Sequence, residues 1–338
     1  TAALILLMIL LYTFKGGVKT IVYTDTLQTS FMLIGLVVCL YYILNHMHLS
    51  FGEAVNQMSQ AGYTKIFETD PQTKSFFLKN LIGGAVIAIA MTGLDQEMMQ
   101  KNISVRTVKD SQKNILTFTV IMVVVNLLFL TLGGLLYLYL TSKGAAYDGN
   151  TFMYNGKNII GDDLFPTIAL FHLPPAIGII FIIALISALF PSADGALTAL
   201  TSSFCIDILG IQRKEGLSEE SQKKTRIAVH LSFAILFLLC IMFFKWLNNK
   251  SIINIILDLA GYTYGPLLGL FFFGILTKRN LGSGYGVTLV CLLAPAICYF
   301  IGKNATQWFN GYQIGFEMLL INGLITFIGL FLLSKKQI

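Results

Sequence analysis

Oxygen-bearing side chains recur at helical spacing inside a strongly hydrophobic segment, residues 186–207. At 3.6 residues per turn, one helical face carries Ser187, Pro191, Asp194, Thr198, Thr201 and Ser202. A carboxylate in the middle of a membrane costs at least about 2.5 to 3.5 kcal/mol, so Asp194 is expected to face a cavity, an ion or a partner. Hydroxyl and carbonyl oxygens beside a carboxylate suit a hard, weakly held cation.

Pro191 changes the backbone chemistry of the same segment. Because proline has no backbone N–H, the carbonyl of Ser187 loses its helical hydrogen bond, and a local bend is expected. An adjacent face carries the small residues Ala188, Ser192, Gly195 and Ala199. Small and hydroxylated residues also let membrane helices pack closely, which is the alternative interpretation of the hydroxyl groups. Close packing does not need the carboxylate of Asp194.

A second polar group lies at the start of another hydrophobic segment. Asp25, Gln28 and Thr29 share one helical face there. Because they are close to the predicted membrane interface, they could also reach water or cap the helix. Both a functional and a structural role remain open for this group.

Two further groups combine acids with helix-interrupting residues. Asp95 and Glu97 lie near the end of one hydrophobic segment, and Asp258 lies within another. The interrupting or aromatic neighbours are Gly83, Gly84 and Gly93 for the first group, and Gly261, Tyr262, Tyr264, Gly265 and Pro266 for the second. Broken helices with nearby acids indicate a cavity or a gate.

The elements that must position these residues are predicted to be membrane helices. Of the 338 residues, 55% are hydrophobic and 12% are charged, and the mean hydropathy is +0.74. A soluble domain has about 25% charged residues, so the composition excludes a soluble protein. The net charge of +6 is explained by loop lysines and arginines and requires no nucleic-acid partner.

Hydrophobic runs of about 20 residues, the length that crosses a bilayer, predict nine transmembrane helices in a single transmembrane domain, residues 1–338. The predicted spans are 2–14, 19–45, 77–99, 114–141, 173–209, 226–246, 252–276, 281–302 and 312–334. The first is too short to cross and is expected to be a helix cut in the middle. Helices of the same protein upstream of Thr1 are therefore expected partners.

Basic residues indicate the orientation, since lysine and arginine in short loops stay on the cytoplasmic side. One set of alternate loops holds 15 of the 23 basic residues. This set is predicted to be cytoplasmic, which places the C-terminus inside the cell and the protein in the cell (inner) membrane as a multi-pass protein.

The remaining reactive side chains do not indicate an enzyme. Cysteines occur at 39, 205, 240, 291 and 298, and histidines at 46, 48, 172 and 230. No Cys-x-x-Cys pair is present, and no histidine pair has the spacing of a helical zinc site. A glycine-rich phosphate-binding loop is also absent from the sequence.

Taken in order, these segments resemble the sodium/solute symporter family. The resemblance rests on 16–28, 95–101, 109–113, 187–207, 265–270 and 277–279, which read GGVKTIVYTDTLQ, DQEMMQK, KDSQK, SALFPSADGALTALTSSFCID, GPLLGL and TKR. It implies an all-α integral membrane protein with the LeuT-like inverted-repeat fold, truncated at the N-terminus. Residues 1–45 would be the last two helices of the first repeat, 77–276 the second repeat and 281–334 peripheral helices.

The family resemblance also implies a sodium site. It would use the carbonyl of Ala188 and the hydroxyl of Ser192, while Pro191 replaces a second hydroxyl ligand. The carbonyl freed at Ser187 could take its place. Asp25 matches an aspartate that contributes to a second sodium site in some members, and Asp194 occupies a position where those members have serine.

The implied function is sodium-coupled symport of a small polar solute by alternating access, with lipid, solute and Na⁺ as the binding partners. Candidate solute-binding residues are Asp95, Glu97, Asp258 and Gln28. Asp95 and Asp258 stand at or near positions where sugar-transporting relatives have amides. Acids accept hydrogen bonds from sugar hydroxyls but favour cations. A sugar or sugar derivative is the leading prediction, with an amino acid or carboxylate as the rival and a transporter-like membrane sensor as the other alternative.

Overall fold

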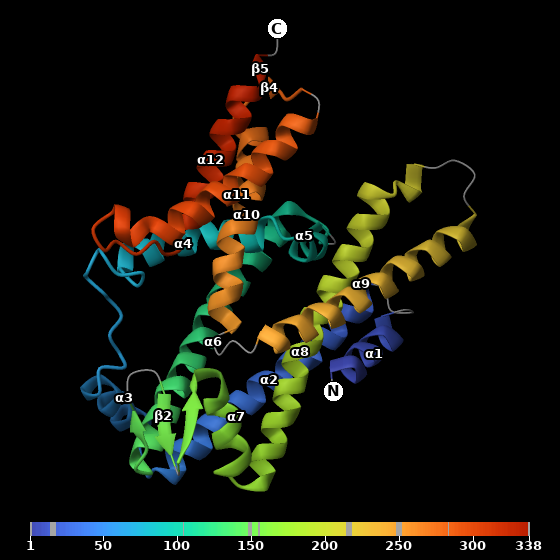
Figure 1. Ribbon diagram of the computed structural model, residues 1–338. Helices are drawn as coiled ribbons and strands as arrows, with labels where there is room; N and C mark the ends of the chain where they lie inside the picture. Colours follow the sequence, from blue (N-terminus) through green and yellow to red (C-terminus); the bar gives the residue numbers. More distant parts are fainter. Residues whose placement is uncertain are drawn as a thin grey trace. The chain divides into compact units, whose positions relative to one another are not determined.

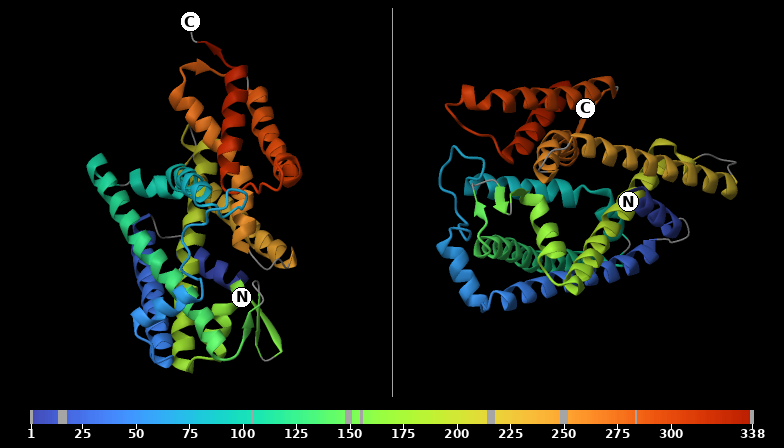
Figure 2. Two further views of the ribbon diagram at one scale, coloured as in Figure 1. Left: turned by 90° about the vertical axis from the view of Figure 1, so that its left-hand side faces the viewer. Right: turned by 60° about the horizontal axis from the view of Figure 1, so that its bottom comes forward.

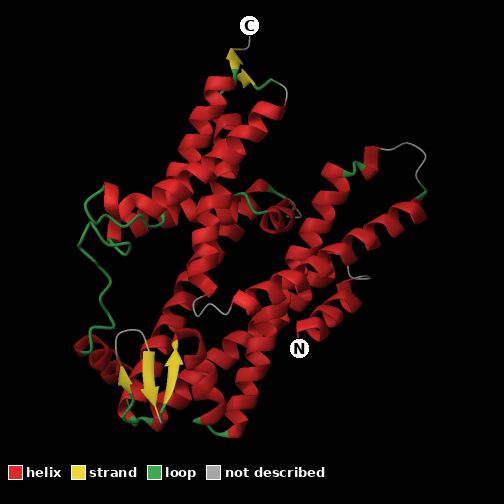
Figure 3. Ribbon diagram, viewed as in Figure 1, coloured by secondary structure: helices red, strands yellow, loops and turns green. Residues whose placement is uncertain are grey.

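The computed structural model describes residues 2–13, 18–103, 105–147, 151–154, 156–213, 218–247, 252–282 and 284–336. Helices make up most of these residues, and the strands are short (Figure 3). The chain divides into two compact units, which we describe separately. Unit 1 comprises Thr1–Thr64 and Gln100–Lys250, and unit 2 comprises Lys65–Met99 and Ser251–Ile338.

The elements of the two units are labelled in Figure 1. Unit 1 contains α1 (Ala2–Thr13), α2 (Val18–His46), α3 (Phe51–Gln60), α6 (Val108–Ser142), β1 (Ala146–Tyr147), β2 (Thr151–Tyr154), β3 (Lys157–Ile160), α7 (Gly161–Phe171), α8 (Pro175–Ser203), the π-helix η2 (Phe204–Ile208), the 3₁₀-helix η3 (Ile211–Arg213) and α9 (Glu219–Leu247). Unit 2 contains α4 (Phe77–Ala88), the π-helix η1 (Ile89–Gly93), α10 (Ile252–Leu276), β4 (Arg279–Asn280), α11 (Gly284–Trp308), α12 (Glu317–Leu333) and β5 (Lys335–Lys336). Helix α5 (Gln96–Ile103) begins in unit 2 and ends in unit 1.

Each of the nine predicted hydrophobic spans contains a helix. Six helices of the described chain are long and apolar enough to cross a membrane: Tyr23–His46, Val108–Ser142, Pro175–Ile208, Glu219–Trp246, Ile255–Leu276 and Gly284–Trp308. The apolar helices Phe77–Gly93 and Glu317–Leu333 are shorter. The predicted span 77–99 is not one helix, because the chain breaks after η1 and restarts at α5. The protein is therefore an α-helical, multi-pass membrane protein.

In unit 1, helices α2 and α8 pack closely and run in opposite directions (Figures 1 and 2). Gly35 permits the contact, because a Cβ at this position would overlap with the Cβ of Ala184 on α8. Leu36 and Ile43 of α2 join Leu135 of α6 in a buried hydrophobic cluster. The apolar residues that mark these segments as membrane helices therefore also form the core between the helices.

A small antiparallel sheet of order β1–β2–β3 covers one end of unit 1 and was not predicted. The Phe152 ring of β2 lies 4.8 Å from the Tyr137 ring of α6 and 4.6 Å from the Tyr147 ring of β1, measured between centroids. Helix α3, also not predicted, begins with a capping box formed by Ser50 and Glu53. Aromatic packing and capping therefore order a region that hydropathy describes only as a loop.

In unit 2, glycines bring α10 and α12 together side by side (Figure 2). A Cβ on Gly265 would overlap with Asn322, and a Cβ on Gly269 would lie 2.6 Å from the Cβ of Thr326. Moving four residues forward on α10, from Gly265 to Gly269, moves the contact four residues forward on α12, from Asn322 to Thr326. The two helices are therefore parallel. This is the close approach that small residues spaced by four permit in membranes.

Asn322 also completes the hydrogen bonding of α10. Pro266 has no N–H to donate to the carbonyl of Tyr262, four residues earlier. The Asn322 side-chain amide, which is fully buried, donates instead to this carbonyl at 2.9 Å and to the carbonyl of Gly261 at 3.1 Å. A proline-released carbonyl inside the membrane therefore receives a donor from a neighbouring helix.

We expect Gly265→Ala to destabilise unit 2 by about 1 to 3 kcal/mol, because the added methyl group forces α10 and α12 apart. Thermal unfolding of the purified full-length protein in detergent measures the effect. Gly274→Ala is the matched control on the same helix, since no atom lies within 4 Å of a Cβ built there. Equal melting temperatures for the two variants would contradict the proposed packing role of Gly265.

Candidate functional site

The polar residues of α8 differ in how far they are exposed. Ser187 and Asp194 are buried, Ala188 is partly buried and Ser192 is exposed on unit 1. The chain stays helical through Pro191, whose missing N–H leaves the Ser187 carbonyl without its intrahelical donor. The predicted cation ligands of α8 are thus not on one face, since Ser192 lies more than a third of a turn from Ser187, and the remaining predicted ligand, Asp25, lies on α2.

Asp194 is fully buried, with 0% of its surface exposed. Its neighbours one turn away on the same helical face, Phe190 and Leu197, belong to a hydrophobic cluster with Leu6 and Ile9 of α1. A carboxylate among such residues is costly unless hydrogen-bond donors or a cation compensate its charge. Packing of apolar side chains alone gives no reason for this residue.

Asp25 and Gln28 lie partly buried on α2. Gly35 of α2 faces Ala184 of α8, and the two helices are antiparallel. Asp25 lies ten residues before Gly35 on α2, and Asp194 lies ten residues after Ala184 on α8. Each step covers about 15 Å along the helix axis. Asp25 and Asp194 therefore lie at corresponding levels of this helix pair. The Oε1 atom of Gln28 is buried and accepts no hydrogen bond from the residues that the structure describes.

A buried polar contact between α8 and α9 was missed by the sequence analysis. The Oγ1 atom of Thr201 donates to the carbonyl of Leu197 at 2.6 Å and lies 3.0 Å from Nδ1 of His230. If the single hydroxyl hydrogen of Thr201 serves the Leu197 carbonyl, Nδ1 of His230 is the donor in the second contact. Thr201 was noted only as a member of the polar face, and no spacing rule links it to His230.

Asp95 occupies the break between η1 and α5 in unit 2. Its Oδ1 accepts a hydrogen bond from the backbone N–H of Met98 at 2.9 Å, which is the geometry of a helix N-cap. Glu97 lies in the first turn of α5, where the helix dipole favours an acid. The predicted break at Gly93 is confirmed, whereas the predicted interruption at Gly83 and Gly84 is wrong, because α4 continues through both glycines. Both acids have a local structural role, which sequence reasoning had not considered.

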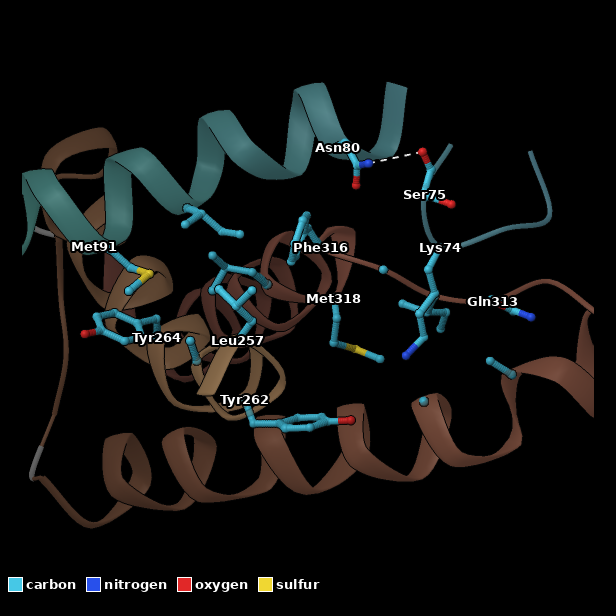
Figure 4. A pocket seen from close by; sticks show the side chains of 18 of the residues that line it. Lys74, Ser75, Asn80, Met91, Leu257, Tyr262, Tyr264, Gln313, Phe316 and Met318 are labelled. Atoms are coloured by element: carbon cyan, nitrogen blue, oxygen red, sulfur yellow. Dashed lines mark hydrogen bonds between the residues drawn. The ribbon is translucent and has the colours of Figure 1, made fainter. Parts of the chain in front are cut away.

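The side chain of Asp258 lies outside the described residues, although its backbone belongs to α10. Its neighbours Gly261, Tyr262 and Tyr264 line a cavity of about 610 Å³ in unit 2 (Figure 4). A cavity was expected near this group, and one is present. The structure thus collects the cation candidates and Gln28 in unit 1, and Asp95, Glu97 and the cavity in unit 2.

Comparisons with known proteins identify relatives for almost the whole chain. A family model described as the sodium:solute symporter family matches residues 1–288. The sodium/sialic acid symporter SiaT of Proteus mirabilis is 25% identical over 329 residues, covering 96% of this chain and 64% of that protein. The sodium/sialic acid symporter NanT of Aliivibrio fischeri is 22% identical, covering 96% of this chain and 62% of that protein. The sodium/pantothenate symporter of Haemophilus influenzae is 24% identical, covering 97% of this chain and 63% of that protein.

A solved structure has a similar fold. It is that of a Na⁺-coupled sialic acid symporter in a substrate-bound, outward-open state, and the TM-score is 0.77 at 21% sequence identity. The match covers 99% of this chain and 67% of that chain. The protein therefore has the predicted LeuT-like fold. The chain spans less than two thirds of the length of the named relatives that it matches.

The capping geometry at Asp95 predicts different effects for two substitutions. Asp95→Asn keeps an oxygen that can accept the Met98 N–H, so stability should be retained, whereas Asp95→Ala should lose about 1 kcal/mol. Thermal unfolding of the full-length protein measures stability, and solute uptake is recorded in parallel. Loss of uptake in the stable Asn variant would assign the charge to function. If Ala and Asn variants are equally stable, the cap contributes nothing.

Proposed function

Because this chain belongs to the sodium:solute symporter family, we propose that its protein carries a small polar solute into the cell together with sodium ions. Members of the family are transporters, not enzymes. The sodium ion and the solute are both cargo. The conclusion on fold does not depend on this proposal, which concerns the activity of the whole protein.

One observation carries the proposal most directly: Asp194 is fully buried in an apolar helix of a chain from this family. A sodium ion would offset the desolvation of its carboxylate, and sodium prefers the oxygen ligands that this part of α8 offers. The same helix carries Ser187, Ser192 and Thr198. The donor set is therefore chemically suited to a hard cation.

The first sodium site would use the Ala188 carbonyl and the Ser192 hydroxyl, both on α8. Pro191 cannot supply a hydroxyl, but it frees the carbonyl of Ser187, which is available as a replacement oxygen. Ser192 is exposed on α8, so its hydroxyl is accessible to an ion.

A second cation site would involve Asp25 and Asp194, which lie at corresponding levels of α2 and α8. Two carboxylates brought together without a cation would repel each other, whereas a bound sodium ion would offset both negative charges. The site would therefore bind sodium through charge as well as through geometry. Its occupancy would set how many ions accompany each solute.

Coupling to sodium supplies the energy for accumulation. A membrane potential of 100 mV provides about 2.3 kcal/mol per charge. A tenfold sodium gradient adds about 1.4 kcal/mol. For an uncharged solute, one sodium ion would thus support an accumulation of several hundredfold. Alternating access would follow if sodium stabilises the outward-facing state and leaves inward with the solute.

The solute is proposed to be a sugar or a sugar derivative. Two of the relatives are sodium/sialic acid symporters, and sialic acid is an acidic sugar. A third relative carries pantothenate, which keeps a carboxylate among the alternatives, beside an amino acid. Asp95, Glu97, Asp258 and Gln28 remain the proposed solute contacts. The orientation from basic loop residues, with a cytoplasmic C-terminus in the inner membrane, is part of the same proposal.

Uptake by the full-length protein in proteoliposomes tests the function. We expect a labelled sugar acid, an uncharged sugar, proline and pantothenate to be taken up to different extents, with the preferred solute requiring sodium on the outside. An inward sodium gradient should drive accumulation, and collapsing it should abolish accumulation. Absence of sodium-dependent uptake for every solute would favour a membrane sensor that uses the transporter fold for recognition alone.

Ser192→Ala is expected to raise the half-saturating sodium concentration several-fold, because it removes an oxygen ligand without adding bulk. The measurement is the sodium dependence of initial uptake rates. Ser232→Ala is the control, since Ser232 is an exposed helical serine whose hydroxyl donates to the carbonyl of Ala228 in its own helix. An unchanged sodium dependence in Ser192→Ala would assign Ser192 to helix packing.

Asp25→Asn and Asp194→Asn are each expected to lower the number of sodium ions carried per solute. The double variant should do little more than either single one, because both remove the same site. Reversal-potential measurements in proteoliposomes give this stoichiometry directly. Asp207→Asn is the control, because Asp207 is exposed just beyond the end of α8 and accepts a hydrogen bond from Ser203. Unchanged stoichiometry in both single variants would exclude the second site.

A further inference from the structure

The cavity of unit 2 has a polar end and an apolar end, as Figure 4 shows. Helices α4, α10, α11 and α12 surround it, together with residues 313–316 before α12. Lys74, Ser75 and Gln313 lie at one end, and Met91, Tyr264 and Leu257 lie at the other. Its volume of about 610 Å³ is within the usual range for sites that enclose a small molecule.

Lys74 gives the polar end a positive charge. Its side chain points into the cavity beside Met318 (Figure 4), and it forms no ion pair with any residue in the described part of the chain. The described lining residues include no aspartate or glutamate. Among the described lining residues, an anion at this end would therefore meet the Lys74 cation and no carboxylate.

The neighbouring Lys79 does not contribute a free charge, because it is fully engaged. Its ammonium group donates to the carbonyls of Thr73 at 3.0 Å and Gln313 at 2.9 Å, and it lies 3.8 Å from Oε1 of Glu317. It also lies 3.5 Å from the centre of the Tyr312 ring. Charge pairing and cation–π contact thus neutralise Lys79 and leave Lys74 as the charge that a ligand would meet.

The contacts of Lys79 also fix the wall of the cavity. They join the start of α4 to the segment before α12, 234 residues away in sequence. The Tyr312 hydroxyl donates to Oε1 of Glu317 at 3.0 Å, and the Gln313 N–H donates to the Gln72 carbonyl at 2.8 Å. The polar end is therefore held in place by hydrogen bonds before any ligand arrives, which lowers the entropic cost of binding.

We propose that this cavity is a binding site for a small organic carboxylate that carries an apolar segment. The carboxylate pairs with Lys74, and the apolar segment contacts Met91, Leu257 and Leu319. The proposal goes beyond sodium-coupled transport, because it assigns a ligand site to unit 2 and does not require that the bound carboxylate is the transported solute. The carboxylate can come from a water-soluble metabolite or from a fatty acid.

Cysteine accessibility in the full-length protein tests the site. Thr306→Cys places a thiol on the exposed, cavity-lining part of α11, in a full-length protein whose native cysteines, including the five in residues 1–338, are replaced by alanine. Modification rates are measured with two methanethiosulfonate reagents, one carrying a sulfonate and the other a trimethylammonium group. Thr288→Cys, an exposed threonine on the same helix that does not line the cavity, is the matched control.

The rate with the sulfonate reagent divided by the rate with the trimethylammonium reagent should be roughly threefold to tenfold higher for Thr306→Cys than for Thr288→Cys, and added salt should reduce this difference. Lys74→Gln should bring the rate ratio close to that of the control site, whereas Lys278→Gln, which removes an exposed lysine just after α10, should not. A ratio that Lys74→Gln leaves unchanged would overturn the electrostatic role of Lys74 and with it the proposal.

Protection experiments identify the ligand class. Pantothenate is a carboxylate with an apolar dimethyl segment, and pantothenol is its uncharged alcohol counterpart. Pantothenate should slow modification of the Thr306→Cys variant and pantothenol should do so much less, with the difference lost when Lys74→Gln is added. Laurate forms the fatty-acid arm: protection by laurate alone would assign the site to a lipid carboxylate. Protection by neither carboxylate, or equal protection by pantothenol, would overturn the proposal.

The outcome is independent of the transport proposal. Sodium-dependent uptake is measured in the same preparation, and protection of the introduced thiol is measured with and without sodium. Carboxylate protection without any sodium-dependent uptake would leave the site standing and remove the proposed symport. Normal sodium-dependent uptake without carboxylate protection would support the proposed symport and overturn the carboxylate site.

Discussion

A carboxylate enclosed by apolar side chains requires a compensating charge or donors, and this requirement organises unit 1. Asp194 is fully buried on α8, and Phe190 and Leu197 on either side of it belong to the hydrophobic cluster that α8 shares with α1. Its desolvation would cost several kcal/mol if nothing offset it. Helices that merely pack would not retain such a residue. The small residues at the α2–α8 contact, Gly35 and Ala184, let the two backbones approach closely.

Prolines have the same backbone effect in both units, but the outcome is different. In unit 2, Pro266 releases the carbonyl of Tyr262, and the amide of Asn322 donates to it at 2.9 Å. In unit 1, Pro191 deprives the carbonyl of Ser187 of its helical donor in the same way. The Tyr262 carbonyl is thus satisfied by a neighbouring amide. The Ser187 carbonyl lies about two turns before Asp194 on the same helix, and it is the oxygen that the proposed cation site would use.

The sequence predicted the helices well, because membrane insertion requires long apolar runs and leaves charges in the loops. The break at Gly93 and the cavity near Gly261 were also predicted. Helices α3 and α7 were missed, since neither is long and apolar enough to register as a span. The role of Asp95 as a cap was missed because it depends on where α5 begins. The contact of Lys79 with Gln313 joins residues 234 apart, and no local pattern indicates such a pairing.

Charge balance connects the cation candidates of unit 1 with the nature of the solute. If one sodium ion accompanies a monovalent carboxylate, the pair carries no net charge, and the membrane potential contributes nothing to accumulation. A tenfold sodium gradient alone then supports only about tenfold accumulation. A second sodium ion restores one net positive charge and adds about 2.3 kcal/mol per 100 mV, besides a second contribution from the gradient. Strong accumulation of an acidic solute therefore depends on a second cation site, which gives Asp25 and Asp194 a physical reason to occupy apolar helices.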